Sequence, residues 1–373
     1  IPLRLVGSEM CIRDSCQSTP NTWLYFRKTV HLPGVPGEMI ANIAVDSKYW
    51  LWINGKMVVF EGGLKRGPAP GATYYDQVDI APYLEKGENT IALLVWYFGK
   101  NGFSHVNSGT AALLFCAQGA NLSIVSDKSW QCSVYRAYQN TEAPFPNYRL
   151  SESNIRFDAR KELAGWNMPD FSGKLGASIE IVAPNEMPFG KLVARPIPMW
   201  KNGGLTDYPE VVKNEKGDTI RCRLPYNCQI TPYLHVKAPA GLVVGMLTDN
   251  YTGGSANNVR AEYITREGEQ EYESFGWMNG HEVLYVVPAG VEVLGVKYRE
   301  TGYNADMKGS FACDDDFYNE LWKRSARTLY ITMRDNYMDC PDRERAQWWG
   351  RVVNELGEAI EQHYPRGWQL ATK

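Results

Sequence analysis

The sequence predicts a multidomain protein in which two β-sandwich domains of jelly-roll type precede the opening helices of an all-α domain. Its 373 residues are enough for two or three domains, each with its own core. From about Thr19 to Tyr303, short apolar runs alternate with polar turns, which is typical of β structure. After Asp314 the apolar residues recur at helical spacing instead.

The first β region, residues 16–170, carries the hairpin signal Asn54-Gly55 between Trp50–Ile53 and Val58–Phe60. Both turn residues tolerate positive φ, so this dipeptide favours a two-residue turn. Short strands and polar turns at this spacing predict a jelly-roll-like sandwich. Trp50 and Trp52 lie on one face of their strand and could form an aromatic platform for a sugar, but core packing is the favoured interpretation.

The second β region, residues 171–308, contains strand-like runs such as Gln229–Val236, separated by turn signals such as Pro239-Ala240-Gly241. These runs predict a second sandwich. In residues 309–373, Asp314–Asp316 supplies an N-cap and an acidic first turn for a helix of about 20 residues. A second helix is expected after the break at Asp339-Cys340-Pro341.

Charge and composition exclude several classes of protein. The formal net charge is -3, so nothing indicates a nucleic-acid-binding protein. The longest apolar run, about Ile91–Phe98, is far shorter than the roughly 18 residues of a membrane-spanning helix. The histidines and cysteines show no metal-ligand spacing, and no nucleotide-binding loop is present. We therefore expect no metal and no cofactor.

Both ends of the chain look foreign to the rest. Residues 1–15 lack the charged start and apolar stretch of a signal peptide, and resemble adaptor-derived read-through. They are left out of the fold prediction. Pro365–Lys373 follows a helical pattern abruptly. We interpret the chain as an N-terminal fragment of a longer protein.

The segment Asp339–Gly350 gathers carboxylates, arginines and two tryptophans around an expected helix start. If the helix began at Glu344, then Glu344, Trp348, Arg351 and Glu355 would share a face away from the apolar stripe. A carboxyl group beside an indole suits a sugar ring. The alternative is a helix whose N-terminal carboxylates are favoured by its dipole and paired with arginines. Inward-pointing arginines would also lower the pKa that a general acid needs raised.

This segment resembles the signature of bacterial α-L-rhamnosidases of glycoside hydrolase family 78, Asp-Cys-Pro-x-Arg-Glu-Arg followed by x-x-Trp-x-Gly-Asp. The resemblance extends over nearly all of residues 19–358. It implies a galactose-binding-like accessory jelly roll for residues 16–170, a β-sandwich for 171–308 and the truncated start of an (α/α)6 six-hairpin barrel for 309–373.

The resemblance further implies an inverting hydrolase that removes terminal α-L-rhamnose with two carboxyl groups and no cofactor. Glu344 occupies the general-acid position, and Asp339, Arg343, Trp348 and Arg351 occupy the substrate-binding segment. The expected partner is a rhamnose-containing carbohydrate, not a nucleic acid or a membrane. Enzymes of this kind usually act in the periplasm or outside the cell.

Two departures from the family pattern matter. The family has a sugar-binding acid where this chain has Arg351, which indicates either altered sugar specificity or a sequence error. The family's general base comes from a later hairpin, and no residue here can be assigned to it, so we expect the chain alone to be inactive. The alternatives are a non-catalytic carbohydrate-binding β-sandwich protein and a six-hairpin glycosidase for another sugar.

Overall fold

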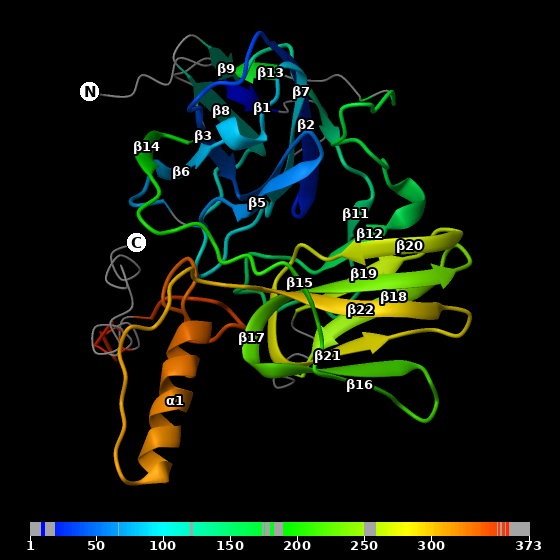
Figure 1. The fold of residues 1–373 in the computed structure, drawn as a ribbon, viewed down its shortest axis with the longest axis vertical. Coiled ribbons are helices and arrows are strands. Elements are labelled where there is room, and N and C mark those ends of the chain that lie inside the picture. Colours follow the sequence, from blue (N-terminus) through cyan, green and yellow to red (C-terminus); the bar gives the residue numbers. More distant parts are fainter. Residues whose placement is uncertain are drawn as a thin grey trace. The chain divides into compact units, whose positions relative to one another are not determined.

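The computed structural model describes residues 9–11, 19–65, 67–119, 122–173, 175, 180–182, 189–249, 259–348, 350, 353–354 and 356–357. The chain forms two compact units. Unit 1 comprises residues 1–101, 105–136 and 163–196, and unit 2 comprises residues 102–104, 137–162 and 197–373. Figure 1 shows the strands of each unit.

Unit 1 is built from two sheets. The first has the order β13-β1-β8-β3-β6-β14, with β9 beside β8, and the second has the order β10-β2-β7-β4-β5. Apart from β14, which is parallel to β6, the neighbouring strands of both sheets are antiparallel. The strands are β1 (Glu9–Cys11), β2 (Thr22–Leu32), β3 (Ile40–Asp46), β4 (Lys48–Ile53), β5 (Lys56–Gly62), β6 (Ala72–Asp79), β7 (Gly87–Tyr97), β8 (Ala112–Gln118), β9 (Ser123–Val125), β10 (Gln131–Val134), β13 (Glu180–Val182) and β14 (Lys191–Ala194), and the 3-10 helix η1 is Ala81–Tyr83.

The predicted hairpin is confirmed. Ile53 of β4 pairs with Lys56 of β5, and the two turn residues have φ angles of 52° at Asn54 and 77° at Gly55. The neighbouring aromatic side chains are buried: Trp50 stacks on Trp23 with ring centroids 5.5 Å apart, and Trp23 stacks on Trp96. These rings pack the core, so Trp50 does not belong to an exposed sugar platform.

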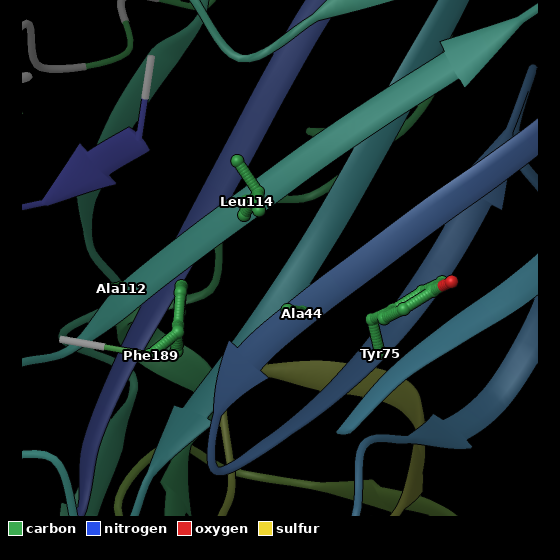
Figure 2. Close-up of a cluster of buried hydrophobic side chains, with 5 residues drawn as sticks. All are labelled: Ala44, Tyr75, Ala112, Leu114 and Phe189. Carbon is green, nitrogen blue, oxygen red and sulfur yellow. The ribbon is translucent and has the colours of Figure 1, made fainter. Parts of the chain in front are cut away.

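Side chains of the first sheet form part of a small buried apolar cluster. Its members come from β3, β6 and β8 and from Phe189, which precedes β14 (Figure 2). Phe189 is 1% exposed, so a residue far along the chain completes this part of the core. The cluster comprises Ala44, Tyr75, Ala112, Leu114 and Phe189, with Leu192 packed against it.

Unit 2 contains one ten-stranded sheet with the order β11-β12-β19-β18-β21-β17-β22-β15, in which β16 and β20 also pair with β17. The long strand β17 contains the predicted strand Gln229–Val236 and extends back past Pro225 to Thr219, because a register shift between Arg223 and Cys228 absorbs the irregular residues. The elements are β11 (Tyr138–Asn140), β12 (Ile155–Asp158), η2 (Ala159–Lys161), β15 (Leu205–Asp207), β16 (Glu210–Lys213), β17 (Thr219–Ala238), β18 (Val243–Thr248), β19 (Arg260–Ile264), β20 (Gly268–Glu273), β21 (Met278–Val286) and β22 (Glu292–Thr301).

The helix α1 (Asp316–Ile331) follows the sheet. The Asp315 side chain caps it by accepting a hydrogen bond from the Phe317 amide at 2.8 Å, which explains the acidic cluster without a bound ion. Its C-terminal end lies beside β17, where the Gln229 side chain donates to the Ile331 carbonyl at 2.8 Å (Figure 1). The apolar stripe is buried only at this end, since Phe317 and Leu321 are exposed.

The strand pairing crosses the boundary that the sequence places at residue 170. β12, inside the predicted first domain, runs parallel to β19 of unit 2. β14, inside the predicted second domain, runs parallel to β6 of unit 1. The chain is mostly β structure with one long helix among the described residues, whereas the six-hairpin barrel of residues 309–373 stays a prediction. None of the described helices combines the length and apolarity needed to cross a membrane.

Candidate active site

Residues 339–346 fold as a closed loop in unit 2. The Asp339 amide donates to the Ala346 carbonyl at 2.9 Å, and residues 341–344 form a turn. Arg345 has a φ of 53°, in the left-handed region that an α-helix does not use. The expected helix therefore does not begin at Glu344, and the described helical residues resume at Gly350. The shared helical face that the spacing suggested is wrong for this reason.

The loop brings the carboxyl groups of Asp339 and Glu344 together instead. The two side chains share a hydrogen bond and are 10% and 2% exposed. Arg343 donates to both oxygens of Glu344, with Nη2 at 3.0 Å from Oε1, and its Nη2 lies 3.5 Å from Asp339 Oδ2. The sequence left open where Arg343 points; the structure turns it toward the pair.

The two carboxyl groups have opposite pKa shifts. Burial, followed by the hydrogen bond with Glu344, raises the pKa of Asp339. Burial alone would raise the pKa of Glu344 as well, but hydrogen bonds from Arg343 and Asp339 outweigh it and lower that pKa. Two carboxyl groups this close cannot both be ionised cheaply, so Asp339 takes up a proton before Glu344 does as the pH falls.

One group among the described residues could hold a metal ion. Potential ligand atoms of Asp339, Cys340 and Glu344 lie within 4.8 Å of one another. The Arg343 guanidinium already neutralises Glu344, and the raised pKa of Asp339 opposes a doubly ionised ligand set. These contacts fit a carboxyl pair that shares a proton better than a divalent-cation site.

Arg345, which directly follows Glu344 in the chain, is buried and stabilises the loop through its contacts. It is 2% exposed and donates to the carbonyls of Pro341 at 2.8 Å and Trp277 at 3.0 Å. Its Nη1 lies 3.1 Å from Glu152 Oε1, and its guanidinium carbon lies 3.3 Å from the centroid of the Trp277 ring. Breaking such a buried ion pair costs about 3–5 kcal/mol, so these contacts fix the strained turn beside Glu344.

The sequence did not identify three residues at the site, Phe103, Tyr148 and Arg149. Arg149 Nη1 lies 3.7 Å from Glu344 Oε2, and the Arg149 guanidinium lies 5.3 Å from the rings of both Phe103 and Tyr148. Phe103 makes an edge contact with the predicted site residue Trp348, with centroids 5.7 Å apart. No local pattern reveals these residues, because they precede the motif by about 190 to 240 positions. Arg351 lies outside the described residues.

Comparisons with known proteins relate the chain to one kind of glycosidase. Residues 306–360 match the model of the bacterial α-L-rhamnosidase six-hairpin glycosidase domain, and this range contains both carboxyl groups of the pair. An α-L-rhamnosidase of Formosa agariphila is 23% identical over 369 residues, which cover 87% of this chain and 36% of that protein. The chain resembles the bacterial α-L-rhamnosidases.

The fold of this rhamnosidase-like chain agrees with solved structures. A GH78 family rhamnosidase of Bacillus sp. GL1 matches with a TM-score of 0.81 and 16% identity, over 94% of this chain and 60% of that one. An α-L-rhamnosidase of Dictyoglumus thermophilum matches with a TM-score of 0.74 and 20% identity, over 97% of this chain and 43% of that one. The chain thus spans about a third of the Formosa protein's length and more of these two.

Proposed function

We propose that this chain supplies the acid half of the active site of an inverting α-L-rhamnosidase, with Glu344 as the general acid. The buried Asp339–Glu344 pair carries this proposal, because its two carboxyl groups share a hydrogen bond, have opposite pKa shifts and lie beside the Arg343 guanidinium. The substrate would be a glycan or glycoside with terminal α-L-rhamnose. The proposed place of action is the periplasm or the exterior of the cell.

The geometry of the pair also indicates what Asp339 does not do. Inverting glycosidases separate their acid and base by roughly 6.5–9.5 Å so that a water fits between them. The carboxyl groups of Asp339 and Glu344 are hydrogen-bonded to each other, which leaves no room for that water. Asp339 therefore acts as a sugar-hydroxyl ligand and proton store, and a further carboxylate serves as the base.

The acid role requires the proton to reach Glu344. Arg343 favours the ionised form of Glu344 in this arrangement, while the raised pKa of Asp339, which lies within hydrogen-bonding distance, favours the neutral form of that group. If a substrate hydroxyl takes over one of Arg343's hydrogen bonds, the lowering of the Glu344 pKa weakens and the proton passes from Asp339. The glycosidic oxygen then receives it from Glu344 as the bond to rhamnose breaks.

The 373-residue chain should release no nitrophenol from 4-nitrophenyl α-L-rhamnoside, since it supplies only one half of the acid–base pair. A longer protein that carries this chain with a complete barrel should release β-L-rhamnose first, as seen by proton NMR of the anomeric signal. In that protein Glu344→Gln should lower kcat by about 10²–10⁴-fold.

The matched control is Glu320→Gln, which changes an exposed glutamate of α1 in the same unit. It should leave kcat unchanged. Full turnover of the Glu344→Gln protein would contradict the acid assignment, and hydrolysis by the 373-residue chain would contradict the expectation that the chain alone is inactive.

A further inference from the structure

An exposed aromatic cluster borders Glu344 in unit 2. Phe103, Tyr148 and Trp348 are 45%, 74% and 45% exposed. Phe103 contacts both other rings edge to face, with centroids 6.4 Å from Tyr148 and 5.7 Å from Trp348. We call these three residues the aromatic rim. Exposing large aromatic side chains to water costs free energy. A rim that brings together three such side chains from distant segments of the chain therefore indicates a ligand-binding surface.

Arg149 connects the aromatic rim to the carboxyl pair. Its Nε donates to the Tyr148 hydroxyl at 3.1 Å, and its guanidinium carbon lies 5.3 Å from the centroids of both Phe103 and Tyr148. Its Nη1 lies 3.7 Å from Glu344 Oε2. The rim therefore begins one side chain away from the proposed general acid.

The backbone holds the rim in place. The Phe103 amide donates to the Arg149 carbonyl at 2.8 Å, which ties residues 102–104 to the loop of Arg149. A Cβ atom at Gly102 would lie 2.7 Å from both the Arg149 carbonyl oxygen and the Ser151 amide nitrogen, so only glycine permits this approach. The spacing of Phe103 and Tyr148 in the rim is thus pre-formed, which lowers the entropic cost of binding.

The chemistry of the reaction decides what lies beside the rim. A general acid protonates the glycosidic oxygen, so the leaving group is bonded to the very atom that Glu344 must reach. We propose that the aromatic rim binds the ring of this leaving group by its flat apolar face, with Arg149 hydrogen-bonding to the ring's polar substituents. The proposal rests on the proposed function. A pyranose and an aryl aglycone both present such a face.

The test measures binding to the 373-residue chain by isothermal titration calorimetry and saturation-transfer NMR. The ligands are methyl α-L-rhamnoside, 4-nitrophenyl α-L-rhamnoside and a rhamnosyl-glucose disaccharide. At least one ring-bearing ligand should bind about 3- to 10-fold more tightly than the methyl glycoside, the range of one aromatic contact. Tighter binding of the disaccharide alone, relative to the methyl glycoside, identifies a sugar as the leaving group. Tighter binding of the nitrophenyl glycoside alone identifies an aryl group. Tighter binding of both shows that the rim accepts either ring.

Two variants test whether the aromatic rim causes the higher affinity for ring-bearing glycosides. Tyr148→Ala and Phe103→Ala should remove most of the ring's advantage and leave the affinity for methyl α-L-rhamnoside unchanged. Tyr148→Phe should keep the advantage of the stacked ring. Phe145→Ala, which changes an exposed aromatic residue of the same segment, should alter nothing. Circular dichroism confirms folding, and Tyr148→Ala decides the question if Phe103→Ala unfolds.

Three outcomes would overturn the proposal. Equal affinity for all three ligands would contradict the proposal that the rim binds the leaving group. It would not contradict the proposed function. An equal loss for methyl and ring-bearing glycosides in Tyr148→Ala places the rim in the rhamnose pocket itself. Absence of binding by every rhamnoside overturns both proposals for this chain.

Discussion

At the scale of single residues, the charge of Arg343 decides the protonation of the site. Its guanidinium donates to both oxygens of Glu344, and it reaches Asp339 at 3.5 Å. A buried carboxyl group without such a partner has a raised pKa, as a general acid requires. Arg343 therefore favours the ionised form of Glu344, and in the proposed mechanism a substrate contact that loosens this pairing would favour the protonated form that the acid needs.

We predict that Arg343→Gln raises the pKa of Glu344 above its ordinary value of 4.5. Removing the main hydrogen-bond donor leaves burial as the dominant influence, and burial favours the neutral form. The pH dependence of the Glu344 carboxyl carbon shift measures the change in the chain. In an active protein, the alkaline limb of kcat/KM should move to higher pH, because the acid keeps its proton longer.

Arg149→Gln is the matched control for this experiment. Arg149 lies 3.7 Å from Glu344 and contributes a weaker lowering of its pKa than Arg343 does. The pKa of Glu344 should therefore rise less in this variant. A pKa of Glu344 that is unchanged or lower in Arg343→Gln would mean that another group keeps the carboxylate ionised.

At the scale of elements, Asp158 links the end of β12 to the short helix η2. Its side chain caps η2 by accepting from the Arg160 amide at 3.2 Å, and the Arg160 guanidinium donates to both carboxylate oxygens at 2.8 and 2.9 Å. The hydrogen bonds from Arg160 lower the pKa of Asp158 below its ordinary value of 3.8, although burial opposes this. The folded state thus favours the ionised form.

The sign of the pH effect follows from this lowered pKa. Asp158 contributes its full stabilisation above the unfolded value of 3.8, and the contribution is lost as the pH falls through the folded value. At pH 7, Asp158→Ala should lower the free energy of unfolding by about 1 kcal/mol through the lost cap. Asp158→Asn keeps the cap and should cost less.

Urea denaturation at pH 7 and near pH 2.5 measures both variants. The difference between the wild type and Asp158→Asn should shrink at the acidic pH, because the native carboxyl group takes up its proton as the pH falls through its lowered pKa. A difference between them that persists unchanged in acid would show that charge is not the source of the stabilisation.

The elements that sequence reasoning predicted are those whose cause is local. The Asn54-Gly55 turn and the Asp315 cap follow from the conformational freedom and hydrogen bonding of a few adjacent residues. The continuous strand β17 was missed, because a register shift lets the ladder pass Pro225. The position of Arg345 in the left-handed region was missed too, since its cause is the distant partner Glu152.

The residues of the candidate site also fall into those that local sequence identified and those that it did not. The motif identified Asp339, Arg343 and Glu344 because their spacing in the chain carries the signal. Phe103 and Arg149 could not be found, because a backbone hydrogen bond and an ion pair across long sequence distances bring them to the motif. Long-range pairing of this kind has no local signature in a single sequence.

At the scale of the whole molecule, each unit is assembled from segments that the other interrupts. Residues 163–196 return to unit 1 after residues 137–162 have joined the sheet of unit 2. The returning segment adds β14 to the edge of β6, places Phe189 in the apolar cluster and brings Arg195 Nη1 to 3.2 Å from Asp76 Oδ1. The domain end that the sequence suggests at residue 170 would remove all three contributions.

We therefore predict that a chain of residues 19–170 is less stable than one of residues 19–196. Loss of Phe189 opens a cavity among Ala44, Tyr75, Ala112 and Leu114, at a cost of about 3–5 kcal/mol. Loss of Arg195 leaves Asp76, which is 1% exposed, without its ion-pair partner, at a similar cost of about 3–5 kcal/mol. Both chains share residues 137–162, so that segment does not bias the comparison.

Thermal denaturation followed by circular dichroism measures the difference between the two chains. Phe189→Ala and Arg195→Met in residues 19–196 should each reproduce part of the loss, because each removes one of the two contributions and keeps the strand β14. Because a domain of this size is only about 5–15 kcal/mol more stable than its unfolded state, losing both contributions should leave residues 19–170 largely unfolded at 37 °C. Equal melting temperatures for the two chains would mean that β14 and Phe189 add nothing to unit 1, and would restore residue 170 as the end of the domain.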